Sequence, residues 1–464
     1  MTDLAPYLLQ ADQLLLAPGQ LMLPDGPVAG HAVVIADGVF RDVGPADALA
    51  ARYPHLKAIE LPGMLLMPGF IDAHHHLTQT FGKALAFGEP SEIFRRIWVP
   101  MEGVLDEEMV YLSSKAAALE SLRGGFTTVV DAGTRAEGDA SAVARATAEA
   151  GLRCVLGFIC NDLGRDAAAV MKQAHAHLAR WHGHALVHPS LAVSIPEVAT
   201  DGMLRDVSAL SAEAGVVFQT HVNEHLVAVE RSLVDRGLRP IEHLHHIGAL
   251  GPQMLLAHAT LITPAELAML RSTDAAVAYN PVASAWKGNA VAPAVLMDAM
   301  GIRFGLGTDG TRSDAFRLLD AAEAAQRYAF GLSIGDSSCG GGWTWLDHAC
   351  GAGAAAIGLG AVTGQIAPGL AADCLLIDIE TPEFAPSWDL TWELVRFGNR
   401  DQIVAVMVGG QLRLWEGWPV DWDGRALMRE VTAAAQRTVA RAPIRRVHPT
   451  SGRHRAATTA RSGV

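Results

Sequence analysis

The chain has 464 residues, of which 50% are hydrophobic and only 18% are charged. This composition supplies a large core and excludes a disordered or collagen-like chain. The formal net charge is −13, from 36 lysines and arginines against 49 aspartates and glutamates, which argues against a nucleic-acid partner because binding a polyphosphate requires a dense basic surface.

The two flanks of the chain share a pattern of short hydrophobic runs separated by turns. Near the start, the runs at 32–35 and 39–43 are separated by Asp37-Gly38, a pair typical of a β-hairpin. Near the end, a candidate strand at 375–379 follows a turn-rich segment. We therefore predict that residues 1–62 and 360–420 form one composite β-domain, a small β-sandwich.

The central part alternates short runs rich in β-branched residues with alanine-rich stretches of helical periodicity. This alternation is typical of a parallel sheet, and eight strands close a (β/α)8 barrel. We predict an α/β fold with a TIM barrel over residues 63–359. The candidate strands are 64–72, 127–131, 153–159, 190–195, 216–221, 254–258, 276–280 and 302–309, and candidate helices include 106–123, 139–150, 204–214 and 264–270.

Residues 421–464 are predicted to form a C-terminal helix and a basic, partly disordered tail. No acidic residue follows Glu430. Such a composition is typical of a solvated segment, although a basic arm that contacts an acidic partner is an alternative. The arginines of this segment are Arg437, Arg441, Arg445, Arg446, Arg453, Arg455 and Arg461.

We expect a cytoplasmic protein without a membrane partner. The first 20 residues contain no lysine or arginine, so the charged start of a secretory signal is missing. No apolar run approaches the roughly 18 residues needed to cross a bilayer. The five cysteines are too few and too scattered for a disulfide framework.

The strongest chemical signal is the segment that begins at Pro68-Gly69 and ends in three consecutive histidines. On a strand, residues two apart face the same side, so His74 and His76 are expected to point together and His75 away. In a barrel, the C-terminal ends of the strands form the active-site face. Two imidazoles at such an end make half of a metal site.

Other candidate strands also end in side chains that bind metals or transfer protons. The fifth strand ends at His221 and is followed by Glu224, the sixth ends at His258, and the eighth ends at Asp309. Because the ends of barrel strands meet at one mouth, we expect these side chains to converge with the first histidine pair. A lone histidine triplet could decorate a surface, but suitable residues at four strand ends favour a site.

These motifs, with Asn280-Pro281 and the return at 364–373, resemble the amidohydrolase superfamily over nearly the whole chain. The resemblance is to the mononuclear branch that contains cytosine and guanine deaminases, S-adenosylhomocysteine deaminase and triazine hydrolases. It implies a small heterocyclic substrate, water as the second reactant, a homo-oligomer, and one divalent metal ion, with Zn²⁺ expected and Fe²⁺ as the alternative. The implied metal ligands are His74, His76, His221 and Asp309.

The residue types suit hydrolytic chemistry. Neutral imidazoles and a carboxylate bind Zn²⁺ or Fe²⁺ and leave a position for water, whose pKa the metal lowers to about 7. Asp309 could accept the proton of that water, Glu224 could pass a proton to a ring nitrogen, and His258 could hydrogen-bond the developing oxyanion. We therefore predict hydrolytic deamination of an aminated purine, pyrimidine, pterin or triazine.

Two alternative functions stay open. The same site could hydrolyse a ring C–N amide bond or a C–Cl bond, and an assay for ammonia separates these from deamination. A barrel that binds metal and ligand without turnover is the second alternative, which Glu224 and His258 disfavour because binding alone requires neither.

One metal ion is expected rather than two. Binuclear relatives bridge their metals with a carboxylated lysine at the end of strand four, and no lysine lies between Lys172 and Lys287. Glu197 could replace it in principle, but it lies beyond Pro196.

Residues that follow the first and seventh strands are candidates for the substrate pocket, because aromatic rings and amides suit a planar heterocycle. The tryptophans could equally be packing residues. These candidates are Gln79, Trp98, Glu102, Trp286, Lys287 and Asn289. Two further histidine groups are expected to have surface or capping roles: His243, His245 and His246 in a predicted helix at 240–248, and His182, His184 and His188 ahead of strand four.

Overall fold

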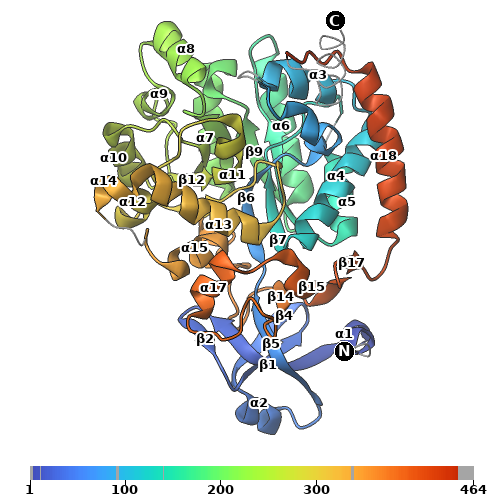
Figure 1. Cartoon of the computed structure of the whole chain (residues 1–464). Coiled ribbons are helices and arrows are strands. Elements are labelled where there is room, and N and C mark those ends of the chain that lie inside the picture. Colours follow the sequence, from blue (N-terminus) through green and yellow to red (C-terminus); the bar gives the residue numbers. More distant parts are fainter. Residues whose placement is uncertain (1–3, 11, 90–92, 139, 336–338, 448–464) are drawn as a thin grey trace, which may run out of the picture.

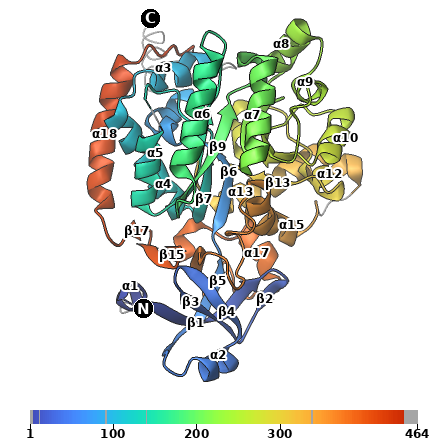
Figure 2. The ribbon, with the colours of Figure 1, turned by 180° about the vertical axis from the view of Figure 1, so that it is seen from behind.

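The computed structural model describes residues 4–10, 12–89, 93–138, 140–335 and 339–447, and it contains two sheets (Figure 1). One is an eight-stranded parallel sheet that forms a nearly closed barrel, and the other is a nine-stranded sheet in a separate β-domain. The β-domain lies below the barrel in Figures 1 and 2. The predicted α/β class, with a barrel and a separate β-domain, is confirmed.

The nine-stranded sheet combines strands from both flanks of the chain. Its central contact is the antiparallel pair of β5 and β14, in which Leu66 lies opposite Leu376. Alternating buried side chains along these strands give the sheet its own core. The strands are β1 (Gln13–Leu23), β2 (Gly26–Val28), β3 (His31–Ala36), β4 (Val39–Pro45), β5 (Ala58–Pro68), β14 (Cys374–Asp378), β15 (Ile403–Val408), β16 (Gln411–Trp415) and β17 (Trp418–Pro419).

The barrel strands follow one another in sequence order, each parallel to the next. The order runs from β6 to β13, and the N–H of Asp309, just beyond β13, donates to the carbonyl of His74 in β6 (2.8 Å). The first and last strands are therefore joined at the barrel mouth. The strands are β6 (Phe70–His75), β7 (Phe126–Asp131), β8 (Arg153–Ile159), β9 (Val187–Val193), β10 (Phe218–Val222), β11 (Met254–His258), β12 (Ala276–Tyr279) and β13 (Phe304–Leu306).

The predicted strand at 64–72 is wrong in one respect, because it is two strands. Residues up to Pro68 belong to β5 in the β-domain, and β6 of the barrel begins at Phe70. Gly69 lies between them, and a Cβ at this glycine would clash with the Thr127 side chain. The apolar sequence around Gly69 does not indicate this break. A glycine is required there because Thr127, which is distant in the sequence, approaches closely.

Helices surround the barrel (Figures 1 and 2), and short polar caps begin several of them. Asp106 accepts the N–H of Met109 at the start of α4, and Thr263 and Glu266 form a capping box on α10. The predicted helix at 139–150 is seen as α5, although Asp139 lies outside the described residues. These helices are α4 (Glu107–Arg123), α5 (Ser141–Ala150), α6 (Ala167–Trp181), α7 (Asp201–Ala214), α8 (Leu226–Arg236), α9 (Pro240–His246), α10 (Pro264–Thr273), α11 (Pro281–Lys287), α12 (Ala294–Ala299), α13 (Ala315–Gln326), α15 (Gly342–Ala349) and α16 (Gly351–Ala356).

Shorter elements complete the chain. They are α1 (Leu4–Gln10), α2 (Ala46–Arg52), η1 (Leu77–Ala86), η2 (Phe94–Trp98), α3 (Val99–Glu102), η3 (Pro196–Val198), η4 (Arg327–Gly331), α14 (Leu332–Ile334), α17 (Leu390–Arg396) and η5 (Arg400–Gln402). In the part of the chain that the structure describes, no helix is both long and apolar enough to span a membrane.

The C-terminal helix α18 (Gly424–Arg441) runs along the barrel beside α4. The segment after it does not behave as a purely solvated tail. Arg445 donates its N–H to the carbonyl of Arg96 (3.0 Å), and Arg446 forms an ion pair with Glu89 (3.2 Å). The other predicted tail arginines, Arg453, Arg455 and Arg461, lie outside the described residues.

Candidate active site

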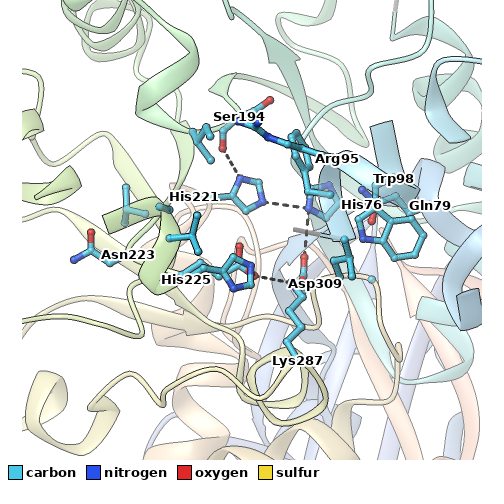
Figure 3. A pocket seen from close by; sticks show the side chains of 18 of the residues that line it. His76, Gln79, Arg95, Trp98, Ser194, His221, Asn223, His225, Lys287 and Asp309 are labelled. Carbon is cyan, nitrogen blue, oxygen red and sulfur yellow. Dashed lines mark hydrogen bonds and ion pairs between the residues drawn. The ribbon is translucent and has the colours of Figure 1, made fainter. Parts of the chain in front are cut away.

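A cavity opens at the C-terminal ends of the barrel strands (Figure 3). The space free of protein atoms in and around it is about 1180 Å³, which includes open solvent at the mouth. Its walls are the segment after β6, the loops after β9 and β10, and the end of α11. Residues that line it and that the sequence singled out are His76, Gln79, Trp98, His221, Glu224, Trp286, Lys287 and Asp309.

The deep end of the cavity gathers imidazoles around one carboxylate. The Nε2 atoms of His74 and His76 each lie 3.3 Å from Oδ1 of Asp309. His76 Nε2 also lies 3.2 Å from Nε2 of His221. The set His74, His221, His258 and Asp309 offers one ligand atom each within 4.8 Å of one another. These donors suit a divalent metal ion.

The protonation states also fit a metal site. Burial lowers the pKa of both His76 and His258 to about 3, and it lowers the pKa of His221 well below its usual value. The rings are therefore neutral, as metal ligands must be. Burial alone would raise the pKa of Asp309, but Lys287 and the neighbouring histidines hold that pKa well below its usual value.

Three buried nitrogens in this cluster lack a hydrogen-bond partner among the described residues: Nε2 of His74, Nδ1 of His76 and Nε2 of His258. Orphaned buried polar atoms are costly in a folded protein and usually point to a missing ligand. The Nδ1 of His221 lies 2.7 Å from the Ser194 carbonyl, so its N–H donates there and its Nε2 faces the cluster. The donor set therefore fits a bound metal ion.

His75 differs from its two neighbours. Its Nε2 lies 3.0 Å from Oγ of Ser313, whereas the Nε2 atoms of His74 and His76 face Asp309. Of these three histidines, His76 is the one that lines the cavity. The backbone at other strand ends is unusual, with positive φ at Asn223 (51°), His258 (76°) and Asp309 (56°). Such strained residues cluster at functional sites because the surrounding packing holds them.

Glu224 lies at the centre of a second set of contacts. Its Oε1 accepts a hydrogen bond from Lys287 Nζ (2.7 Å) and lies 3.2 Å from His225 Nε2 and 3.6 Å from His258 Nε2. Burial would raise the pKa of Glu224, but His258 and Lys287 hold it well below its usual value. Asn280 Nδ2 lies 3.2 Å from His258 Nδ1 and orients that ring.

Two of the predicted pocket residues lie behind the cavity wall. Glu102 is fully buried and accepts hydrogen bonds from Thr78 Oγ1 (2.5 Å) and Arg135 Nη1 (2.6 Å). Arg135, not Glu102, lines the cavity. Asn289 lies 3.1 Å from Nδ1 of His225 and supports that ring from outside the cavity. The carboxylate of Glu102 and the amide oxygen of Asn289 therefore face neighbouring polar side chains and not the cavity.

Other lining residues were not predicted for the pocket, and one of them, Glu197, was considered from the sequence only as a substitute for a metal-bridging lysine. Ser194 and Glu197 follow β9, and Arg135 follows β7. The rule that barrel strand ends form the mouth could have found all three. Glu197 is notable because its Oε1 is buried without a hydrogen-bond partner among the described residues, and burial raises its pKa.

The two other histidine groups lie elsewhere and have structural contacts. His243 Nε2 lies 2.9 Å from Asp201, and the Nδ1 of His184 accepts the N–H groups of Leu186 and Val187. His188 lies 3.3 Å from Nη1 of Arg153. None of these histidines lines the cavity.

Comparison with known proteins decides the family. Residues 65–413 match the amidohydrolase family, and residues 32–55 match an imidazolonepropionase-like composite domain of bacteria. The chain belongs to the amidohydrolase family. This membership confirms the predicted superfamily and the prediction of a hydrolase that acts on C–N bonds.

A curated relative of this amidohydrolase is the 5-methylthioadenosine/S-adenosylhomocysteine deaminase of Nitratidesulfovibrio vulgaris, 29% identical over 418 residues, 87% of this chain and 92% of that one. A similar fold is seen in an adenosine deaminase from Xanthomonas campestris with bound zinc, with TM-score 0.85, 22% identity, and coverage of 92% and 98%. Atrazine chlorohydrolase TrzN from Arthrobacter aurescens, complexed with zinc, has TM-score 0.81, 21% identity, and coverage of 91% and 100%. The deaminase relatives agree with the predicted hydrolytic deamination.

Proposed function

We propose that this amidohydrolase holds one zinc ion and removes an amino group from a nitrogen heterocycle by hydrolysis, with an adenosine derivative as the first substrate class. The observation that carries the proposal is the convergence of imidazoles, Asp309 and Glu224 at the deep end of one cavity. Fe²⁺ is the alternative metal, since both ions accept imidazoles and a carboxylate. The adenosine class is supported by the curated deaminase relatives.

The proposed ligands are His74, His76, His221 and Asp309, as the resemblance to the family implies. When bound, the ion would supply a water molecule acidic enough to lose a proton near pH 7. His258 is assigned to hydrogen-bond the oxygen that develops on the attacked carbon, which its contact with Asn280 supports. His258 in place of His76 as a ligand is the competing arrangement, because its Nε2 also reaches the cluster.

Asp309 and Glu224 then carry out the proton transfers of the reaction. Glu224, an ionised carboxylate, takes one proton from the attacking water and passes it to the ring nitrogen beside the amino-bearing carbon. Asp309 takes the second proton of that water and returns it to the amino group. The C–N bond to the amino group breaks, the amino group leaves as ammonia with that proton, and the carbon keeps the new oxygen. Gln79, Trp98 and Trp286 line the space where a planar ring would lie.

We also propose a cytoplasmic homo-oligomer with neither nucleic-acid nor membrane partners. The acidic composition supports the absence of nucleic acid. The homo-oligomer rests on family resemblance, and chromatography with light scattering tests it.

Metal analysis combined with an ammonia-release screen tests the function. The screen contains adenosine, 5′-methylthioadenosine, S-adenosylhomocysteine, guanine, cytosine, a pterin and an aminotriazine. We expect about one zinc per chain, ammonia from at least one compound, and loss of turnover after chelation with recovery when zinc is returned. Products without ammonia, such as chloride from a chlorotriazine or a ring-opened amide, would instead support the alternative hydrolase. If no product forms from any compound, the result would support a barrel that binds metal and ligand without turnover.

Two variants separate metal binding from proton transfer. Asp309→Asn should lose zinc, whereas Glu224→Gln should keep zinc and lose about 10²–10⁴-fold in turnover. Glu230→Gln, at an exposed position of α8, is the matched control. Unchanged turnover in Glu224→Gln would disprove the proposed proton transfer.

A further inference from the structure

Lys287 lies between the two carboxylates of the candidate site. Its Nζ is 2.7 Å from Oε1 of Glu224 and 2.6 Å from Oδ2 of Asp309. Figure 3 shows its side chain extended toward Asp309. Both distances are those of charge-assisted hydrogen bonds. One ammonium group therefore connects the proposed proton carrier to a proposed metal ligand.

The two oxygens of Asp309 face different partners. Oδ1 faces the Nε2 atoms of His74 and His76 at 3.3 Å each, whereas Oδ2 faces Lys287. Lys287 therefore does not contact the Asp309 oxygen that faces the histidines. Lys287 can keep its contacts while an ion is held among the imidazoles.

The three charges are shielded from water. The exposed fractions of the side chains are 11% for Lys287, 14% for Glu224 and 5% for Asp309. Coulomb interactions are stronger in such surroundings than in water, so two carboxylates without the lysine would repel one another. Lys287 offsets this repulsion and fixes Glu224 on the Asp309 side of the cavity.

The backbone that carries Lys287 supports Glu224 by a second route. α11 ends at Lys287, and Gly288 follows with φ 70°, a conformation that favours glycine and turns the chain back. Asn289 then reaches Nδ1 of His225 (3.1 Å), and Nε2 of His225 lies 3.2 Å from Oε1 of Glu224. One short segment therefore reaches the same carboxylate oxygen directly through Lys287 and indirectly through Asn289 and His225.

We propose that Lys287, assisted by Asn289 through His225, is a positioning residue that holds Glu224 beside Asp309 for the reaction. The inference rests on the proposed function for the role of Glu224, but the contacts themselves do not depend on it. Lys287 acts through the two carboxylates and is not assigned a contact with substrate. Its removal should disturb turnover and raise the attraction of the site for a cation.

Lys287→Met tests the proposal in two independent assays. Zinc affinity, measured by competition with a chelating dye, should rise about tenfold, because a positive charge beside Asp309 is removed. Turnover, kcat, should fall on the order of 100-fold through misplacement of Glu224, while KM changes less than threefold. A side chain that merely filled space would leave zinc affinity unchanged or weaken it when lost.

Companion variants guard against a folding defect. Lys287→Arg keeps the charge and should recover part of kcat and the normal zinc affinity. Asn289→Ala should lower kcat by a smaller factor without changing zinc affinity, and Lys172→Met, at an exposed position of α6, should match the wild type. If Lys287→Met does not fold, Lys287→Gln takes its place.

The proposal would be overturned if Lys287→Met, or Lys287→Gln in its place, bound zinc no more tightly than the wild type. It would also be overturned if the kcat of that variant lay within threefold of the wild-type value. The zinc comparison needs no substrate. If the wild type releases no ammonia from any compound, the proposed function fails while the affinity comparison still decides whether Lys287 holds the carboxylates.

Discussion

Asp72 in β6 accepts hydrogen bonds from both the backbone N–H (2.9 Å) and the hydroxyl (2.5 Å) of Thr308, just beyond β13. The same carboxylate accepts the N–H of His74 (3.2 Å), and the carbonyl of His74 accepts the N–H of Asp309. The closing seam of the barrel therefore holds a histidine and the aspartate of the candidate site side by side.

Thr308→Val should weaken both the fold and the metal site. The variant keeps the shape but removes one hydrogen bond from a buried carboxylate, so the free energy of unfolding should fall by about 1–3 kcal/mol. Zinc affinity should fall about 10–100-fold, as for other groups that orient metal ligands. Urea unfolding and a competition titration measure the two effects, with the exposed Thr432→Val as control. Lower stability with unchanged zinc affinity would show that the seam serves the fold alone.

Glu102→Gln should loosen Arg135 in the cavity wall. Glu102 is the buried partner of Arg135, whose guanidinium also lies over the Phe94 ring at 4.4 Å. Removing one charge of such a pair costs about 2 kcal/mol or more. We expect a lower unfolding free energy, KM raised about tenfold, and unchanged zinc affinity. An unchanged KM would mean that Arg135 does not contact the substrate.

Glu89→Gln should release the C-terminal segment from the cavity wall. The buried Glu89 carboxylate binds Arg96 (2.8 Å), Arg446 (3.2 Å) and the N–H of Val447 (2.8 Å). A loss of about 1.4 kcal/mol would raise the population of the open segment about tenfold. Limited proteolysis with mass spectrometry should show faster cleavage near residues 93–103 and 442–447. Equal cleavage of variant and wild type would contradict this role.

His188 should contribute to acid lability. Burial, followed by the nearby Arg153, lowers its pKa from 6.5 to about 4. As pH falls from about 6.5 through 4, the unfolded chain takes up a proton that the folded chain resists, so stability present at neutral pH is lost, up to about 3 kcal/mol.

His188→Gln removes this titration. The difference in unfolding free energy between pH 7 and pH 4 should therefore be smaller in the variant than in the wild type, as measured by urea unfolding at both pH values. His55→Gln, at an exposed position, serves as control. A pH dependence identical to that of the wild type would rule out the contribution.

The barrel and the convergence of its strand ends could be expected from local patterns. Strand periodicity sets which side chains share a face, and parallel barrel strands bring their C-terminal ends to one mouth. His76, His221 and Asp309 come together for this reason, although they are far apart in the chain. The sharp break at Gly69 escaped this reasoning, because it depends on a contact with Thr127.

The partners of individual polar side chains depended instead on how the loops pack. The periodicity of the sequence does not indicate that Lys287 bonds to both Glu224 and Asp309. It also does not indicate that Glu102 pairs with Arg135, or that the C-terminal segment contacts Glu89. These pairs are separated by 22 to 357 positions along the chain. The type and spacing of residues determine which way side chains point along one helix or strand. Contacts between loops depend instead on the packing of all elements together.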